Sequence, residues 1–320
     1  MHIYMWFTIL VLWYYQVCHV TPHRPCNVFV PNPRASRGCQ LKFRNFTITS
    51  MEDNPLAGLP DSYEVLTFTN FKTLRKAVSF VVEKLNQNDD NGNQFIVIHQ
   101  LTKHARQRLD EEKDILGSTF RFMWEGETGI VKLMPSAAHD YVTDDLSRTI
   151  SRACEGMGMP VLEIAWGIST THPGGKSGDE GKGKQTDQCL SPLPRQPING
   201  QVTGWPTLAI ETGVSESLPR FRQDAAWWFR NSRGDTRIVL VMGIKRKTQD
   251  IVLEKWHLAP ANTQSVSRPF VLQDIRITKA SAFGGPLVLS FEALFCRPSQ
   301  GTEVDIVLDQ QQLTSCARFI

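Results

Sequence analysis

The fold is decided by the stretch Trp205-Pro206-Thr207-Leu208-Ala209-Ile210-Glu211, a short apolar run that ends on a carboxylate and predicts a buried strand. Apolar residues then recur at helical spacing between Leu218 and Asn231. Ile238–Met242 predicts a second buried strand, and Ile251–Trp256 predicts a strand that pairs with it through a hairpin. Because strand, helix and strand follow one another, we expect the first two strands to be parallel with a right-handed crossover. Glu211 then lies at the end of a parallel strand, where such sheets expose their chemistry.

The composition is that of a globular protein. Of the 320 residues, 41% are hydrophobic and 21% are charged, so the chain can bury a core. This length fits one large domain or two ordinary ones. The formal net charge of +3 is only mildly basic, below the level of a dedicated nucleic-acid binder. Overall charge therefore does not choose between classes of partner.

Seven cysteines are scattered along the chain, and none forms a C-x-x-C pair. An odd number without paired spacing indicates neither a zinc site nor a disulfide framework. We expect most of them to be reduced, buried thiols, as in an intracellular protein of the cytoplasm or nucleus.

The N-terminal segment argues for a different location. Ile3–Val17 is almost entirely apolar, which suits a signal-peptide core better than a full membrane span. It has no preceding Lys or Arg and no small-residue cleavage site, and a buried strand is an alternative interpretation. Six prolines between residues 21 and 60 predict an irregular lead-in. We expect residues 1–60 to be this lead-in, signal-like or anchor-like at its start, and residues 61–320 to form one domain with its core at 119–257. Secretion or membrane anchoring through residues 3–17 is the alternative location.

The rest of the chain alternates between helical and strand patterns. Helices are predicted at Phe71–Leu85, Lys103–Asp114 and Val142–Ala153, with a final short helix near the C-terminus. Strands are predicted at Phe95–Ile98, Thr119–Trp124, Gly129–Met134, Val161–Ile168, Thr186–Leu190, Ser267–Ile277, Val288–Leu294 and Val304–Leu308. Thr171–Lys184 is rich in Gly, Lys and Asp, which predicts a mobile loop. This mixture fits an α/β or α+β fold.

Two carboxylates stand at comparable places in the predicted sheet, Asp187 at the start of one strand and Glu211 at the end of another. Neighbouring strand ends can bring both within reach of one Mg²⁺ (or Mn²⁺), which takes oxygen ligands of this kind. Such an ion lowers the pKa of bound water and neutralises charge on a transferring phosphoryl group. Arg220 and Arg222, in the following helix, could stabilise the developing charge. Structural salt bridges or surface positions are the alternative interpretation of both acids.

The same residues carry a resemblance to a known family. The order of Met134-Pro135-Ser136 with His139, then Thr186-Asp187-Gln188, then Pro206 to Glu211, resembles the PD-(D/E)XK nuclease superfamily and its restriction endonuclease branch. Gly213–Trp228, Ile238–Val241 and Glu254–Trp256 look like fungal proteins related to that branch. The resemblance runs from about Arg121 to Trp256.

The resemblance implies a restriction-endonuclease-like fold, with a mixed central sheet flanked by helices and a metal-dependent phosphodiesterase site at one edge. Asp187 matches the motif aspartate, Glu211 the motif glutamate, and His139 a histidine that opens the first core helix. The implied ion is Mg²⁺ or Mn²⁺, held by these three residues. The implied partner is nucleic acid, with no small-molecule cofactor.

The chain departs from the family pattern at the motif lysine. Two residues after Glu211 stands Gly213, and the best match on the helix is Asp224, which could simply pair with Arg220 one turn away. Arg220 or Arg222 would have to supply the missing charge. Because arginine does not release its proton at useful pH, it could stabilise charge but could not act as a base.

Two functions from different classes remain. The first is a metal-dependent nuclease or phosphodiesterase acting on nucleic acid, which the retained acid pair favours. The second is a catalytically inactive module that binds nucleic acid or a protein partner, which the missing lysine favours. The basic hairpin tip Lys245-Arg246-Lys247 is expected either to contact phosphates or to be a solvated turn.

Overall fold

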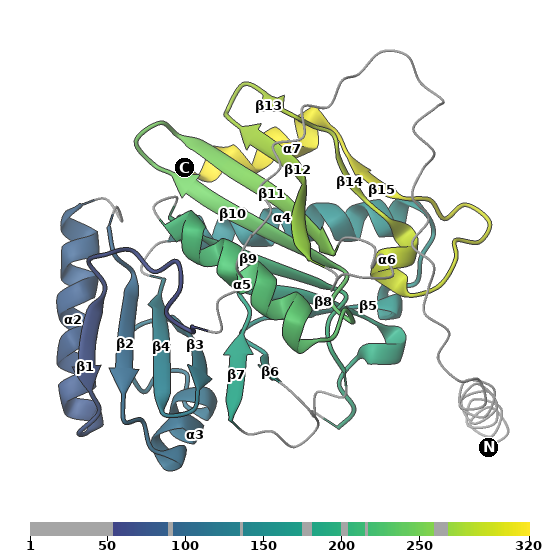
Figure 1. The fold of residues 1–320 in the computed structure, drawn as a ribbon. Helices are drawn as coiled ribbons and strands as arrows, with labels where there is room; N and C mark the ends of the chain where they lie inside the picture. The colour runs from purple at the N-terminus through teal and green to yellow at the C-terminus, as the bar shows by residue number, and fades with distance from the viewer. Residues whose placement is uncertain are drawn as a thin grey trace, which may run out of the picture. The chain divides into compact units, whose positions relative to one another are not determined.

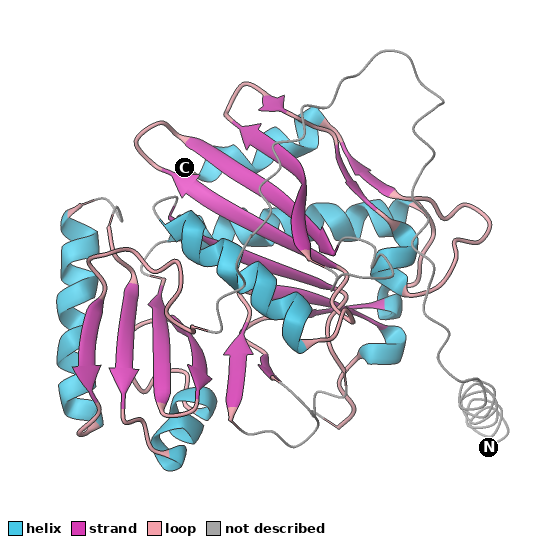
Figure 2. Ribbon diagram, in the orientation of Figure 1, coloured by secondary structure: helices cyan, strands magenta, loops and turns pink. Residues whose placement is uncertain are grey.

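The computed structural model describes residues 54–88, 92–134, 137–174, 181–199, 204–214, 217–258 and 268–320. All of them belong to one compact unit, residues 43–320. Within these ranges the strands form two large mixed sheets and one small sheet, with helices on the sheet faces (Figures 1 and 2). The predicted mixed α/β class with flanking helices is confirmed. The strands are divided between sheets instead of forming a single central one.

The first large sheet has six strands in the order β1-β2-β4-β3-β7-β6. These are β1 (Glu64–Thr67), β2 (Phe95–His99), β3 (Phe120–Glu125), β4 (Thr128–Leu133), β6 (Thr171–Pro173) and β7 (Lys182–Gln185). The parallel pair β1 and β2 is joined by α2 (Phe71–Gln87), which begins where the Asn70 side chain accepts a hydrogen bond from the Thr73 amide. Leu74, Val78, Val81 and Leu85 form its buried face. The shorter α3 (Lys103–Glu111) contributes Ala105 and Leu109 to the same core cluster.

The second large sheet has seven strands in the order β13-β12-β11-β10-β9-β8-β5. These are β5 (Ile164–Gly167), β8 (Gln188–Pro192), β9 (Leu208–Val214), β10 (Ile238–Lys245), β11 (Asp250–Leu258), β12 (Pro269–Ile277) and β13 (Ala282–Phe283). β9 and β10 are parallel, with α5 (Leu218–Asn231) between them in the chain, and β10 and β11 form an antiparallel hairpin. The predicted strand–helix–strand unit is therefore confirmed.

Further elements surround the second sheet. They are α4 (Ala137–Gly156), α6 (Phe291–Phe295), α7 (Gln310–Cys316), the small sheet of β14 (Leu287–Leu289) and β15 (Ile306–Leu308), and 3-10 turns at Val161–Glu163, Leu193–Arg195 and Ala317–Phe319. Residues of α4, α6, α7 and β15 share one buried apolar cluster with β9, β10 and β11. This cluster forms one core of the unit.

A different apolar cluster joins the two large sheets. Phe95 and Ile130 of the six-stranded sheet share it with Ala209 and Val241 of the seven-stranded sheet. The indole of Trp228, on α5, is fully buried in the same cluster. One face of each sheet and α5 thus make a continuous core, which positions the polar residues described below.

Three predicted segments differ from the structure. Thr171–Lys184 is not a loop at its described ends, because Lys182–Gln185 pairs with β3 as strand β7. A side chain at Gly183 would overlap the Trp124 indole, so a glycine that indicated flexibility instead permits close packing. Val161–Ile168 begins as a 3-10 turn before β5, and Val288–Leu294 leaves strand geometry after Leu289 to enter α6.

Several sequence predictions fall partly or wholly outside the described residues, and the apolar segment Ile3–Val17 is one of them. No helix in the described ranges is long and apolar enough to cross a bilayer. Of the cysteines that the structure describes, Cys154, Cys189 and Cys316 are buried and Cys296 is partly exposed, and all four are free thiols.

Candidate functional site

Asp187 lies where the chain passes from one sheet to the other. β7 ends at Gln185 and β8 begins at Gln188, so Thr186 and Asp187 connect the six-stranded sheet to the seven-stranded one. The Thr186 hydroxyl donates to the carbonyl oxygens of Gln188 (2.8 Å) and Ile210 (3.2 Å), which fixes the crossing point.

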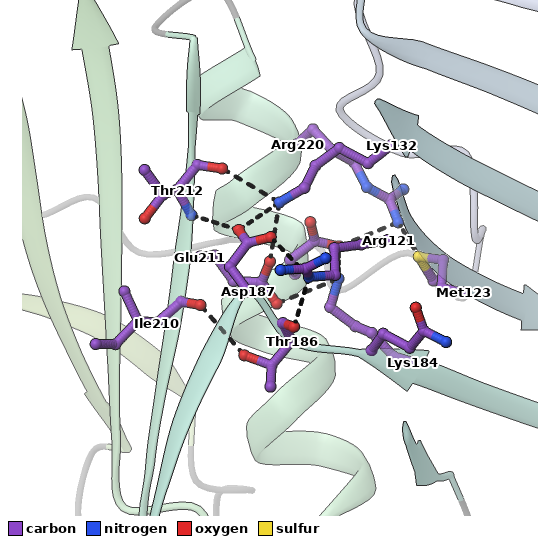
Figure 3. A network of polar contacts seen from close by, with 12 residues as sticks. Arg121, Met123, Lys132, Lys184, Thr186, Asp187, Ile210, Glu211, Thr212 and Arg220 are labelled. Atoms are coloured by element: carbon purple, nitrogen blue, oxygen red, sulfur yellow. Dashed lines mark hydrogen bonds and ion pairs between the residues drawn. The ribbon is translucent and has the colours of Figure 1, made fainter. Parts of the chain in front are cut away.

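The Asp187 carboxylate accepts contacts from three sides. The amide of Thr212 donates to Oδ2 at 2.7 Å, and the Lys132 ammonium donates to the same oxygen at 2.5 Å. Arg121 Nε lies 3.5 Å from Oδ1, and His139 Nε2 lies 3.4 Å from Oδ2. Figure 3 shows Lys132 and Arg121 lying beside Asp187. The aspartate is surrounded by cations and is 2% exposed.

Glu211 meets the same lysine. Its Oε2 lies 3.5 Å from Lys132 Nζ, its Oε1 accepts the indole N–H of Trp228 at 2.7 Å, and Lys184 Nζ is 3.3 Å from Oε1. The two predicted acids therefore converge, because both carboxylates contact one ammonium group. The glutamate is 1% exposed.

The network continues to α5 through Lys184. Its ammonium is 3.2 Å from Asp224 Oδ1, and Arg220 Nη2 is 3.1 Å from the same oxygen. Arg220 also donates to the carbonyl oxygens of Pro55 and Ala57. The expected pairing of Asp224 with Arg220 is present, but both side chains are buried and Lys184 is a third member.

Three cations of the network come from the six-stranded sheet, while Arg220 lies on α5 and His139 on α4. Arg121, Lys132 and Lys184 come from β3, β4 and β7 of the six-stranded sheet. The acids come from the crossing point, from β9 and from α5. The network is therefore an electrostatic contact between the two sheets, and its carboxylates are buried.

The pKa values of the acids follow from their partners. Burial alone would raise the pKa of Asp187, but Lys132, His139 and Arg121 outweigh it and hold that pKa well below the ordinary value of 3.8. Burial likewise opposes ionisation of Asp224, and Arg220 and Lys184 outweigh it to lower the pKa.

Glu211 behaves differently. Burial raises its pKa above 4.5, and the lysines only partly offset this, because Asp187 and Asp224 add repulsion. Lys184 is held in its charged form, since Asp224 and Glu211 outweigh its burial and raise the pKa of its ammonium group.

His139, at the start of α4, is arranged as a cation. Its Nε2 faces the carbonyl oxygen of Thr212 at 3.0 Å, and its Nδ1 faces Asp140 Oδ1 at 3.0 Å. Both partners are acceptors, so both ring nitrogens must donate. Burial opposes the imidazolium, but Asp187 and the hydrogen bond to Asp140 outweigh it and raise the pKa of His139. An imidazolium has no lone pair to offer a metal ion.

The remaining predicted site residues lie elsewhere. Arg222 extends to Glu254, with Nη2 2.5 Å from Oε1, and not to the acid pair. Lys245 is the last residue of β10, and Arg246 and Lys247 begin the turn to β11. Lys245 and Lys247 are exposed.

Sequence reasoning missed Lys132, Lys184 and Arg121. Lys132 is a single charge inside the apolar strand Ile130–Leu133, and a buried lysine there requires a buried carboxylate partner. A lone lysine in an apolar strand therefore indicates a buried ion pair, although it does not identify the partner residue. Lys184 lies in a segment that the sequence predicts as a mobile loop, so its burial in a site was not expected.

The residues present do not fit a divalent cation as they are arranged. No group of three or more His, Cys, Asp or Glu side chains that could hold a metal ion occurs in the described ranges. The Lys132 ammonium takes the position between the two carboxylates where an ion would neutralise them. The adjoining cavity, lined by Lys132, Lys184, Arg220 and Asp224 among others, is about 10 Å³. Mg²⁺ usually keeps several waters, and this space holds about one at most.

No protein-family model matches the chain, and no curated protein matches it in sequence. Among solved structures, the chain is similar to a "putative nuclease belonging to DUF820" from Anabaena variabilis, at 12% sequence identity and a TM-score of 0.36. The similar region covers 61% of this chain and 90% of that one. Function is therefore argued from the site and not from this similarity.

Proposed function

We propose that this protein is a catalytically inactive module of a nuclease-like fold, and that it acts by binding nucleic acid. One observation supports a catalytically inactive site: the buried ammonium group of Lys132 contacts both Asp187 and Glu211. A carboxylate pair neutralised in this way has little charge left to attract a divalent cation. The lysine occupies the space that the cation and its waters would need.

The closure of the site is built into the core and is not a lid. The chain runs without interruption from β7 through Asp187 into β8. The apolar cluster that includes Phe95, Val241 and Trp228 holds the two sheets together along the same face. Separating the sheets to expose the acids would expose this core to water, which is costly.

The binding role rests on charge and resemblance. The exposed lysines of the β10–β11 turn suit phosphate contacts, which are electrostatic and independent of sequence. The resemblance of the motif order to PD-(D/E)XK nucleases is part of the same proposal, since a fold of that kind approaches nucleic acid at the acid-bearing edge of its sheet. A protein partner is the alternative outcome of the binding test.

A second candidate is the metal-dependent nuclease, with Mg²⁺ or Mn²⁺ at Asp187 and Glu211. The convergence of the two acids favours it. It requires Lys132 and His139 to withdraw so that the ion can enter, and it would use Lys132 in place of the missing motif lysine.

One experiment separates the two candidates. The wild-type protein is incubated with single- and double-stranded DNA and RNA in the presence of Mg²⁺, Mn²⁺ or chelator, and binding is titrated in parallel at several salt concentrations. Salt-sensitive binding without cleavage supports the inactive module. Cleavage that needs the metal and disappears in Glu211→Gln establishes the nuclease and ends the proposal.

Thermal unfolding with and without the metal gives an independent readout. A cation that bound the folded protein at 100 times its Kd would add about 2.7 kcal/mol to the free energy of unfolding. We expect no Mg²⁺-dependent shift for the wild type. A shift that Asp187→Asn abolishes would contradict the proposal.

A further inference from the structure

We propose that two adjacent hairpin turns at one end of the seven-stranded sheet form a contact surface for single-stranded nucleic acid, with Phe283 as the base-stacking residue. The inference rests on the proposed function and identifies its partner and its surface.

The two turns lie at the same end of the sheet. The β10–β11 turn follows Lys245, and Lys245 pairs with Asp250 at the start of β11. The next strand returns to that end, because Ile251 pairs with Ile277, the last residue of β12. The turn between β12 and β13 therefore lies beside the turn between β10 and β11, as Figure 1 also shows.

The strand register places four side chains in a staggered row on one face at this end of the sheet. Lys245 is opposite Asp250, whereas Arg276 is opposite Val252 and Phe283, two residues further along β11. Arg276 bonds to Asp250 across this offset through Nε at 2.7 Å. Opposite residues of antiparallel strands share a face of the sheet.

The face of this row is fixed by the apolar residues beside it. Ile244, Ile251, Ile277 and Ala282 alternate with the row and all belong to the core cluster on the opposite face. Asp250 is 1% exposed, so its charge is covered by Arg276 and is not presented to solvent. The surface that remains is cationic at Lys245 and aromatic at Phe283.

Phe283 is the feature that points to bases. Phe283 is 63% exposed on the edge strand β13, where it pairs in register with Arg276. An exposed ring next to cations offers a stacking platform with phosphate contacts on either side. Lys247 and Lys279, both exposed, extend the positive charge over the two turns. A duplex keeps its bases stacked on one another, so an isolated ring selects for single strands.

The test uses the full-length protein and a fluorescein-labelled oligothymidylate or oligouridylate of about 12 nucleotides, with a duplex of the same length as competitor. Binding is followed by fluorescence anisotropy across salt concentrations. We expect the single strands to bind more tightly than the duplex. Phe283→Ala should weaken single-strand binding by about fivefold or more, the effect of losing one stacked base.

The lysines are tested together and against a charge-matched control. The triple variant Lys245→Ala, Lys247→Ala and Lys279→Ala should flatten the plot of log affinity against log salt by about 0.7 for each phosphate that the variant no longer neutralises. The control triple variant changes the exposed lysines Lys72, Lys76 and Lys103 of α2 and α3 and should leave the slope near that of the wild type. Phe80→Ala, which removes another exposed ring on α2, is the control for Phe283→Ala.

The outcomes separate the two proposals. If the two triple variants weaken binding equally, the proposed surface is wrong while the inactive binding module stands. The same conclusion follows if Phe283→Ala and Phe80→Ala bind single strands equally well. A preference for the duplex also overturns it. Absence of binding to every polymer overturns the binding role itself, and this surface with it.

Discussion

The indole N–H of Trp228 donates to Oε1 of Glu211 at 2.7 Å, so the helix that follows strand β9 returns to fix the carboxylate of that strand. Lys184 reaches the same oxygen from the other sheet, at 3.3 Å. Glu211 is therefore held from both sides, and its second oxygen, Oε2, accepts no hydrogen bond from the described residues although Lys132 is 3.5 Å away. The Glu211 carboxylate is therefore fixed in place by contacts from α5 and from the six-stranded sheet.

The Trp228 hydrogen bond can be tested against its neighbour. Trp228→Phe leaves a buried carboxyl acceptor without its donor and should lower the free energy of unfolding by about 1 to 3 kcal/mol beyond the loss of indole volume. Trp227→Phe removes an indole whose Nε1 has no hydrogen-bond partner among the described residues, so it removes similar volume without that penalty. Urea denaturation of both variants measures the difference. Equal losses would show that the Trp228 bond contributes nothing.

Lys132 is the central cation of the network. Lys132→Met leaves Asp187 and Glu211 buried without their shared partner and should cost about 3 to 5 kcal/mol of stability. Lys76→Met, at an exposed position of α2, should change stability by less than about 0.5 kcal/mol.

A second change identifies the cause. In Lys132→Met combined with Glu211→Gln, one unpaired charge is also removed, so part of the lost stability should return. The measure is the interaction free energy of the double-mutant cycle. If the two losses simply add, the ammonium group does not act through the acid pair.

His139 gives the network a pH dependence. Its pKa in the folded protein lies above the ordinary value of 6.5, so its contribution to stability is fully present below that pH and is lost as pH rises through the raised pKa. The stability difference between wild type and His139→Gln should therefore be larger at about pH 6 than at about pH 9. Asp187 has the opposite sign: its contribution is present at neutral pH and is lost in acid, below the ordinary value of 3.8.

The pH series is measured by thermal or urea unfolding, with His104→Gln, at an exposed position of α3, as the control. A difference between wild type and His139→Gln that does not change with pH would show that His139 is not charged in the folded protein.

The N-terminal lead-in can be divided by truncation. Leu56 and Leu59 pack against the cluster between the sheets, and Arg220 donates to the carbonyl oxygens of Pro55 and Ala57. Residues 1–60 are expected from the sequence to be an irregular lead-in, but these contacts tie residues 55–59 to the core. Deleting residues 1–53 should leave the Tm unchanged, whereas deleting residues 1–60 should lower it by about 2 to 4 °C for each kcal/mol of stability that the segment contributes.

A point change tests the same packing without shortening the chain. Gly58 has a φ of +74°, and a Cβ at this position would lie 2.5 Å from the carbonyl oxygen of Pro219. Gly58→Ala should therefore lower the Tm in the same direction as the longer deletion. An unchanged Tm in both variants would show that this segment does not support α5.

Much of the fold was predictable because its signals are local. The strand that contains Glu211, the amphipathic helix with Trp228 and the strand from Ile238 are each indicated by hydrophobic period and length, and the crossover rule predicts the parallel pairing of the two strands. The expected end of the first strand at Glu211 was wrong, because β9 continues to Val214 and places Glu211 in its middle. The division into two sheets was not predictable in the same way. It depends on β7 pairing with β3, a contact between residues far apart in sequence and of weak strand propensity, as Gly183 illustrates.

The site was predictable only in part. Its acids stand in motifs whose spacing can be read, and Asp187 and Glu211 do converge. Its cations do not. Lys132 reaches an aspartate 55 residues away in the chain and a carbonyl oxygen 80 residues away, and neither separation leaves a pattern in the sequence. Tertiary contacts of this kind are decided by how two sheets pack, which no local period encodes.

The two acids and the lysine that neutralises them lie in separate parts of the sequence, which matters for how the site can change in evolution. Asp187 and Glu211 lie in the segment from β7 to β9, whereas Lys132 lies upstream of α4, in a strand of the other sheet. Recombination that replaced only the part of the gene upstream of α4 could thus change the charge state of the acid pair while both acids remained intact. The charge of this site is therefore decided by the residue at position 132 as much as by the two acids themselves.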